Sequence, residues 1–192
     1  MDTYRNLTHK TSLGFRWATN FCQGASYFAS ADSDMLVNVH NIVRRLVNKP
    51  REKYAEGRLI TKAVPRRNRA SKWFTSKEMY PDPTYAPYFT GAFYVLTADV
   101  AVNACREFVH VQFIPWDDVY IGFVLQRLEV HLVHVAGYVQ YVELNDDGAI
   151  ASALVKSKAV VLDHQTNDVN TRYLKIWEEA MPQMINGKKG KR

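Results

Sequence analysis

Two acidic segments have the residue types and spacing needed for catalysis, and the first follows a strand-like stretch. Residues 27–39 read YFASADSDMLVNV, so Asp32 and Asp34 end an apolar run predicted to be a buried strand. Alternating strand side chains place two such carboxylates on one side. A divalent cation such as Mg²⁺ or Mn²⁺ would relieve their repulsion and leave positions for substrate phosphates. Alternatively, Asp and Ser only cap the helix predicted after them, and this segment alone favours the cap.

The second acidic segment is Asp117-Asp118, which is predicted to open a helix after Pro115-Trp116. The helix dipole favours carboxylates at this end, which explains one of them without any catalytic role. Alternatively, one of the two is a general base that deprotonates a hydroxyl nucleophile. Neighbouring helical positions diverge by ~100°, so only one carboxylate is expected to face a cleft.

Aromatic residues surround a turn expected at Thr90-Gly91-Ala92, within residues 85–94 (YAPYFTGAFY). Gly91 permits either a close backbone approach or a positive φ. Aromatic faces beside polar tips suit sugar rings, although aromatic core packing is the favoured interpretation for most of these residues. His164 follows a predicted strand and is either a core residue or a metal ligand.

Strands and helices alternate along the chain, which predicts an α/β fold with a mixed sheet and helices on both faces. Residues 1–20 are predicted to form a loop followed by an amphipathic helix, along which Leu13, Trp17 and Phe21 recur at four-residue spacing as its apolar stripe. Further helices are predicted from Met35 to about 48, at 98–108, from 117 and at 169–181. Strands are predicted at 59–64, 93–96, 131–135, 139–143 and 159–162. Residues 1–182 are expected to form one catalytic domain, followed by a basic disordered tail at 183–192.

The net charge of +6 is concentrated in the tail and in a long loop at residues 65–91 that carries Arg67 and Lys72. No nucleic-acid motif accompanies these cations, so we expect the loop cations to bind the phosphates of a nucleotide rather than a polynucleotide, and the tail to be a solvated end. No apolar run approaches the ~20 residues that cross a bilayer. Asn6-Leu7-Thr8 is an N-glycosylation sequon, and Cys22 and Cys105 leave the disulfide state open.

Six ordered segments of the chain resemble the motifs of one enzyme family. They are residues 2–11 (DTYRNLTHKT), 32–38 (DSDMLVN), 65–73 (PRRNRASKW), 85–91 (YAPYFTG), 117–122 (DDVYIG) and His164, thirteen residues before Trp177. Together they resemble glycosyltransferase family 31, the beta-1,3-galactosyltransferase and beta-1,3-N-acetylglucosaminyltransferase group. Ser33 stands in place of the family's middle acid, and Phe89 in place of its cysteine.

The resemblance implies a GT-A-like fold that binds a UDP-sugar through Mn²⁺ and transfers galactose or N-acetylglucosamine in beta-1,3 linkage with inversion. It implies Asp34 and His164 as metal ligands, and Asp118 as the base. The remaining implied positions are Asp32, Arg67 and Lys72 at the donor, and Tyr88, Gly91, Trp116 and Asp117 at the acceptor.

The resemblance also implies a Golgi enzyme facing the lumen, with a glycoprotein or glycolipid acceptor, a glycan at Asn6 and a membrane anchor that this chain lacks. The family's first strands should precede Asp2, so we expect a domain that is incomplete at its amino terminus. The alternative is a catalytically silent fragment that acts as a lectin-like or interaction module.

Overall fold

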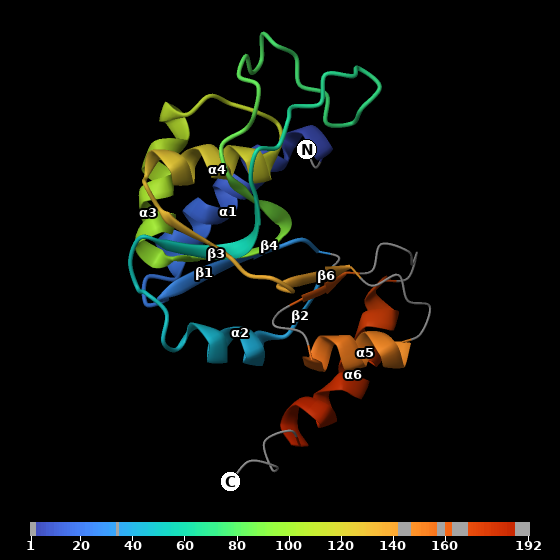
Figure 1. The fold of residues 1–192 in the computed structure, drawn as a ribbon. Helices are drawn as coiled ribbons and strands as arrows, with labels where there is room; N and C mark the ends of the chain where they lie inside the picture. The colour runs from blue at the N-terminus through green and yellow to red at the C-terminus, as the bar shows by residue number, and fades with distance from the viewer. Residues whose placement is uncertain (1–2, 34, 142–146, 157–159, 163–168, 187–192) are drawn as a thin grey trace. The chain divides into compact units, whose positions relative to one another are not determined.

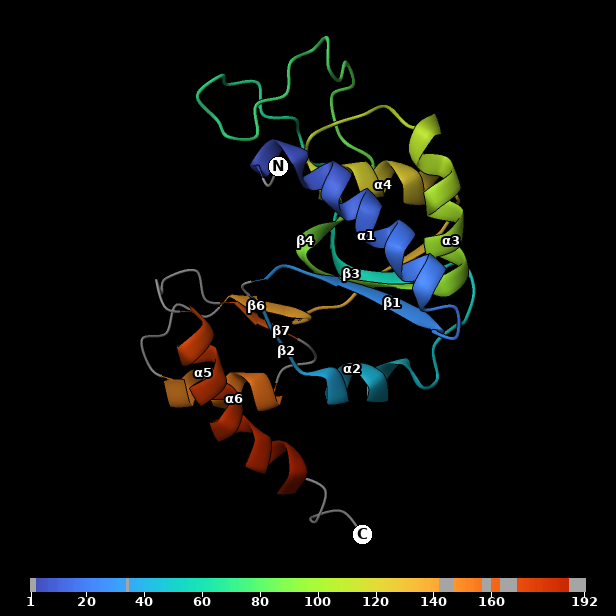
Figure 2. The same ribbon diagram turned by 180° about the vertical axis from the view of Figure 1, so that it is seen from behind.

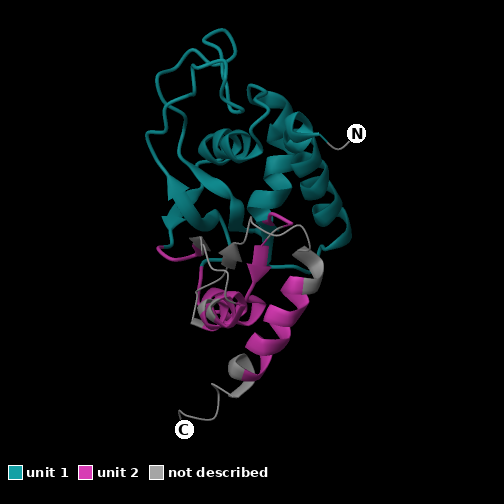
Figure 3. Ribbon diagram, turned by 90° about the vertical axis from the view of Figure 1, so that its right-hand side faces the viewer, with its two compact units in different colours: residues 1–30, 50–135 teal, residues 31–49, 136–192 magenta. Residues whose placement is uncertain are grey.

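The computed structural model describes residues 3–33, 35–141, 147–156, 160–162 and 169–186. The chain forms two compact units, one from residues 1–30 and 50–135 and the other from residues 31–49 and 136–192 (Figure 3). Each unit has its own sheet and its own hydrophobic core. The predicted α/β class with a mixed sheet is confirmed.

A four-stranded sheet forms the first unit, in the order β1-β4-β3-β5. Its strands are β1 (Tyr27–Ala31), β3 (Tyr54–Ile60), β4 (Tyr88–Thr97) and β5 (His131–His134). β3 pairs antiparallel with β4 and parallel with β5, which makes the sheet mixed. β1 lies at the sheet edge and is only half-buried, so the prediction of a buried strand there is wrong.

Three helices, α1 (Leu7–Phe21), α3 (Ala98–Glu107) and α4 (Asp117–Arg127), lie together on one face of this sheet (Figures 1 and 2). Short 3₁₀ turns at Tyr4–Asn6 and Phe108–His110 flank α1 and α3. The buried cluster between the helices and the sheet contains Ala55, Phe89, Tyr94, Leu96, Val100, Ala101, Ile121 and Leu125. Nearly every turn of α4 is buried, so this helix is held firmly against the sheet.

The apolar stripe predicted to anchor α1 faces outward instead. Leu13, Trp17 and Phe21 are 63%, 61% and 72% exposed. The helix packs through its other side, where the Phe15 and Phe108 rings pack edge to face with 5.7 Å between their centroids. The predicted helix is therefore confirmed, but its predicted buried face is wrong.

The described residues of the second unit form a three-stranded sheet, β2-β7-β6, and three helices. Its elements are β2 (Met35–Val37), α2 (Val39–Leu46), β6 (Val139–Tyr141), α5 (Asp147–Lys156), β7 (Val160–Leu162) and α6 (Val169–Asn186). Its core contains Leu36, Ile150, Ala151, Leu154, Ile176 and Ala180. The prediction missed α5, and it placed residues 35–37 in a helix although they pair with β7. α6 continues to Asn186, past the tail boundary expected at 182.

Two features bear on the chain's environment. None of the described helices is long and apolar enough to cross a membrane. Cys22 and Cys105, the only cysteines in the sequence, are free thiols.

Phe89 is a core residue and is 2% exposed. Its ring packs directly against Gly57, because a Cβ added to Gly57 would lie only 2.8 Å from the nearest ring atom.

Candidate active site

The two acids that open α4 have different partners. Asp117 accepts a hydrogen bond from the Thr11 hydroxyl of α1, with 2.7 Å between Oγ1 and Oδ2. Asp118 accepts from the backbone N–H of Val119, which is 2.7 Å from its Oδ1. Asp117 therefore joins α4 to α1. Asp117 also lies in the first turn of α4, where the helix dipole favours a carboxylate.

Asp118 lies against the start of β4. A Cβ added to Gly91 would lie 3.7 Å from the Asp118 Cβ, so the strand backbone comes close to this acid. Burial raises the pKa of Tyr88 to about 12, and the Asp118 carboxylate adds to the rise. Burial likewise raises the pKa of Tyr85, and Asp118 contributes there too. Asp118 therefore has two protonated tyrosines in its electrostatic surroundings at neutral pH.

Gly122 allows α4 to approach β4 this closely. A Cβ on Gly122 would lie 2.6 Å from the Tyr88 Cβ and 2.9 Å from the Pro87 carbonyl oxygen, closer than side chains tolerate. Gly91 has no positive φ and lies inside β4, so the turn predicted at residues 90–92 is wrong. A Cβ at Gly91 would make only ordinary contact with the Asp118 Cβ, so neither of the two alternatives for Gly91 is confirmed.

Trp116 immediately precedes α4 and is 7% exposed. Its indole N–H donates to the Thr75 hydroxyl at 2.9 Å, and that hydroxyl also shares a 2.7 Å hydrogen bond with the Tyr85 hydroxyl. The ring thus connects the start of α4 to the long loop. Its assignment to the acceptor stays a prediction, while the contacts give it a packing role.

Arg67 organises the long loop between β3 and β4. Its Nη1 donates to the carbonyls of Thr75 and Ser76 at 2.9 and 2.8 Å, and its Nη2 donates to those of Tyr80 and Asp82 at 2.8 and 3.1 Å. These four bonds use all four terminal N–H groups of a guanidinium. Arg67 therefore holds the loop in shape, and its assignment to the donor stays a prediction.

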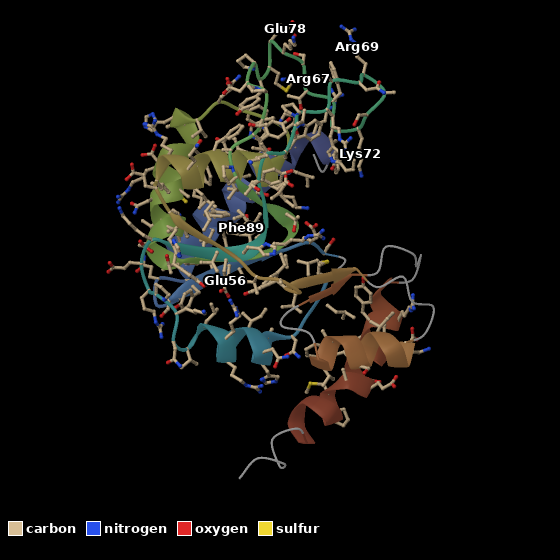
Figure 4. All side chains as sticks on the ribbon, in the orientation of Figure 1. Glu56, Arg67, Arg69, Lys72, Glu78 and Phe89 are labelled. Atoms are coloured by element: carbon tan, nitrogen blue, oxygen red, sulfur yellow. The ribbon has the colours of Figure 1, made fainter. Side chains whose placement is uncertain are left out.

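Lys72 lies on the same loop and contacts aromatic rings. Its Nζ is 4.4 Å from the centroid of the Trp73 ring and 5.4 Å from that of the Tyr4 ring. Figure 4 shows Arg67, Arg69, Lys72 and Glu78 along this loop, whereas Glu56 and Phe89 lie in the sheet. The assignment of Lys72 to the donor phosphates is not tested by these contacts.

The acid predicted to contact the donor, Asp32, belongs to the second unit and is exposed. α2 is capped by Asn38, whose Oδ1 accepts from the Asn41 N–H at 3.0 Å. The Asn38 amide also donates to the Leu154 carbonyl at 3.0 Å. The interpretation of Asp32 and its neighbours as the helix cap is therefore wrong. Asn38 is the structural residue of this segment.

The two predicted metal ligands, Asp34 and His164, lie outside the described residues. β2 pairs antiparallel with β7, and Met35 is opposite Leu162. Met35 directly follows Asp34 in the sequence, and Leu162 is two residues before His164. Among the described residues no group of three or more His, Cys, Asp or Glu side chains could hold a metal. A carboxylate suits Mn²⁺, and a neutral imidazole is a common ligand of divalent metals.

The sequon at Asn6 is part of the folded start of α1. Asn6 is half-buried, and Thr8 is buried and donates its hydroxyl to the Ile114 carbonyl at 2.8 Å. The folded chain thus uses the sequon threonine to hold α1 to the segment before α4.

An α/β unit that presents a helix-start carboxylate beside a strand glycine fits the glycosyltransferase class that the motifs imply. A sequence model described as Galactosyltransferase matches residues 1–136. The chain belongs to this galactosyltransferase family, which confirms the resemblance.

The chain is similar to beta-1,3-galactosyltransferase 1 of Mus musculus and of Homo sapiens. It is 32% identical to each over 182 residues, which are 93% of this chain and 53% of the relative. It is 38% identical to beta-1,3-galactosyltransferase 5 of Pan troglodytes over 133 residues, 69% of this chain and 45% of that relative. The chain thus spans about half the length of these curated relatives.

Proposed function

We propose that the protein transfers galactose or N-acetylglucosamine from a UDP-sugar to an acceptor hydroxyl in beta-1,3 linkage, with Asp118 as the general base. The observation that carries this proposal is the position of Asp118, which opens a buried helix and lies against Gly91 of β4. The names of the related beta-1,3-galactosyltransferases support galactose as the sugar and the beta-1,3 linkage. Asp117 is not the proposed base, because its carboxylate binds Thr11.

The proposed reaction is a single in-line displacement. Asp118 takes the proton of the acceptor hydroxyl while the oxygen of that hydroxyl bonds to the anomeric carbon. The bond from that carbon to the diphosphate oxygen breaks, and UDP leaves with the electron pair. The new glycosidic bond forms on the opposite face of the sugar, so the configuration inverts. No carboxylate nucleophile is needed for this route.

We further propose that Asp34 and His164 hold Mn²⁺ and that Asp32 contacts the sugar-nucleotide. When bound, the ion would supply positive charge that stabilises the departing diphosphate. The described pairing of Met35 with Leu162 supports this proposal, because the two predicted ligands are near these positions in the sequence. Asn38 would orient the acidic segment by capping α2 directly after it.

On the acceptor side we propose that Tyr88 and Gly91 line the path of the incoming hydroxyl. The protonated Tyr88 hydroxyl can donate a hydrogen bond to a sugar oxygen at neutral pH, and the missing side chain of Gly91 leaves room before Asp118. The acceptor would be a glycan on a glycoprotein or glycolipid, modified in the Golgi lumen where such family members are expected.

The alternative is a catalytically silent chain that binds glycans as a lectin-like or interaction module. A thermal melt with UDP, with Mn²⁺ and with both together separates the two proposals. A ligand that binds only the folded chain at 100 times its dissociation constant stabilises it by about 2.7 kcal/mol. That is a rise in melting temperature of about 5–10 °C for a chain of this size.

The transferase proposal expects this rise only with UDP and Mn²⁺ together, and UDP release from UDP-galactose when acceptor is added. No rise at saturating UDP and Mn²⁺, together with no UDP release, would leave the silent module as the explanation.

A further inference from the structure

Three residues form an exposed cation–aromatic cluster, which we name the Lys72 cluster: Tyr4, Lys72 and Trp73. The Trp73 indole N–H donates to the Tyr4 hydroxyl at 2.8 Å, which holds the two rings together. The Lys72 ammonium lies 4.4 Å from one ring centroid and 5.4 Å from the other. Tyr4 and Trp73 remain 47% and 44% exposed, so the cluster still presents aromatic surface to solvent.

Lys72 differs from the other cations of this loop in what surrounds it. Arg67 uses its terminal N–H groups on four carbonyls. The Arg69 guanidinium lies 6.0 Å from the centroid of the Phe74 ring, and its positive charge helps to lower the pKa of Glu78. Among the residues that the structure describes, no ion pair involves Lys72. Its charge is held in place by rings, and no oxygen of the residues that the structure describes accepts a hydrogen bond from its three N–H donors.

The Lys72 cluster lies next to the start of α4 rather than elsewhere on the surface. The Tyr4 ring contacts the Trp116 ring, with 6.2 Å between their centroids. Trp116 immediately precedes the two acids that open α4. One further aromatic contact therefore connects the cluster to the end of the helix that carries Asp118, the proposed base.

We propose that the Lys72 cluster binds an anionic sugar of the acceptor glycan, one that carries a carboxylate or a sulfate at a distance from the accepting hydroxyl. This inference rests on the proposed function, because it assigns the cluster to the acceptor. The exposed parts of the two rings offer apolar surface for the C–H face of a sugar ring. The ammonium, already positioned by the rings, offers donors for the anion. Lys72 then serves the acceptor rather than the donor diphosphate.

Direct binding tests the proposal without turnover. Three trisaccharides with the same terminal N-acetylglucosamine are titrated into the chain: one neutral, one with a sulfate on the third sugar and one with a uronic acid there. The variants are Lys72→Met, which keeps the stem but removes the charge, and Lys72→Arg, which restores it. The matched control is Lys77→Met, which removes the same charge from an exposed position on the same loop.

The wild-type chain is expected to bind at least one anionic trisaccharide about two- to fivefold more tightly than the neutral one at low salt, the range of an exposed ion pair. Lys72→Met should abolish that preference, whereas Lys77→Met and Lys72→Arg should retain it. A preference for only one anionic probe identifies sulfate or carboxylate as the group recognised.

The proposal is overturned if the wild type does not distinguish the probes or if Lys77→Met loses the preference equally. It is also overturned if Lys72→Met weakens the binding of UDP with Mn²⁺, since Lys72 would then serve the donor. A preference that depends on Lys72 in a chain that releases no UDP supports the subsite while contradicting the proposed transfer.

Discussion

Gly91 and Asp118 meet where β4 passes the start of α4, and a Cβ on Gly91 would lie 3.7 Å from the Asp118 Cβ. A methyl group at residue 91 would be in ordinary contact with the acid, so the fold itself does not require glycine there. The absence of a side chain instead keeps open the space beside the carboxylate, which explains a glycine inside a buried strand.

Gly91→Val is therefore expected to impair turnover far more than stability. Valine suits a strand, but its two methyl groups would occupy the space beside Asp118. We expect kcat/KM to fall about 100-fold, the effect of a small misplacement of reacting groups, with a change in melting temperature of a few degrees at most. Steady-state kinetics and a thermal melt of the same preparation check this. A variant that unfolds, or one with full turnover, would contradict it.

Alanine substitution at two helical glycines is expected to change stability in opposite directions. Gly122→Ala would place a Cβ 2.6 Å from the Tyr88 Cβ and should cost about 1–3 kcal/mol of stability. Gly14→Ala is the matched control, because nothing lies within 4 Å of its added Cβ on the exposed side of α1. Removing a helical glycine there should add about 0.5–1 kcal/mol. Urea unfolding of both variants measures the two signs, and equal effects would be inconsistent with the packing described.

The long loop is expected to depend on Arg67 more than on its neighbours. Arg67→Ala leaves four carbonyls without their donor and should lower the free energy of unfolding by about 2–3 kcal/mol. Arg69→Ala, on the same loop but exposed, should change it by no more than about 0.5 kcal/mol. Chemical denaturation and limited proteolysis at residues 66–82 report the difference. Similar results for the two variants would remove the loop-holding role of Arg67.

Tyr88 predicts how stability changes at alkaline pH. Its pKa is 10.0 in ordinary surroundings and about 12 in the folded chain, mainly through burial. Because the folded chain holds this proton more tightly, the stability it contributes is complete below pH 10 and is lost as the pH rises toward 12. Tyr88→Phe should therefore flatten the decline in stability over this range, by about 1 kcal/mol after allowing for solvent screening.

Thermal melts from pH 9.5 to 11.5 measure how stability declines with pH. Tyr27→Phe is the control, because Tyr27 lies on β1 rather than on β4. An unchanged slope in Tyr88→Phe would show that another group titrates.

Local patterns predicted the elements around the site more successfully than their packing. The helix that begins at Asp117 follows from an acidic start and an apolar period, and it is confirmed. The face that α1 buries could not be read from spacing, since Leu13, Trp17 and Phe21 repeat correctly and yet are exposed. α5 was missed because residues 149–154 (AIASAL) are all either small or apolar, so they show no clear helical period of polar and apolar positions.

Roles that depend on long-range contacts were beyond sequence reasoning. Arg67 reads as a cation for phosphates, but its partners are carbonyls 8 to 15 residues away that only the folded loop brings together. The capping role of Asn38 could have been predicted from the sequence, because asparagine is a preferred N-cap residue. Its side chain accepts from the backbone N–H three residues later, at Asn41. In the sequence, only the family resemblance favoured Asp118 over Asp117 as the base. The hydrogen bond from Thr11 to Asp117 is an independent reason for the same choice.

The most direct test of the central claim compares Asp118→Asn with Asp117→Asn, in a version of the chain that turns over. Asp118→Asn should lower kcat by about 10²–10⁴-fold and leave the affinity for UDP with Mn²⁺ nearly unchanged. Asp117→Asn should keep most turnover and cost about 0.3–1 kcal/mol of stability from the helix start, with a further loss if its bond to Thr11 weakens. If Asp117→Asn abolishes turnover while Asp118→Asn retains it, Asp118 is not the base.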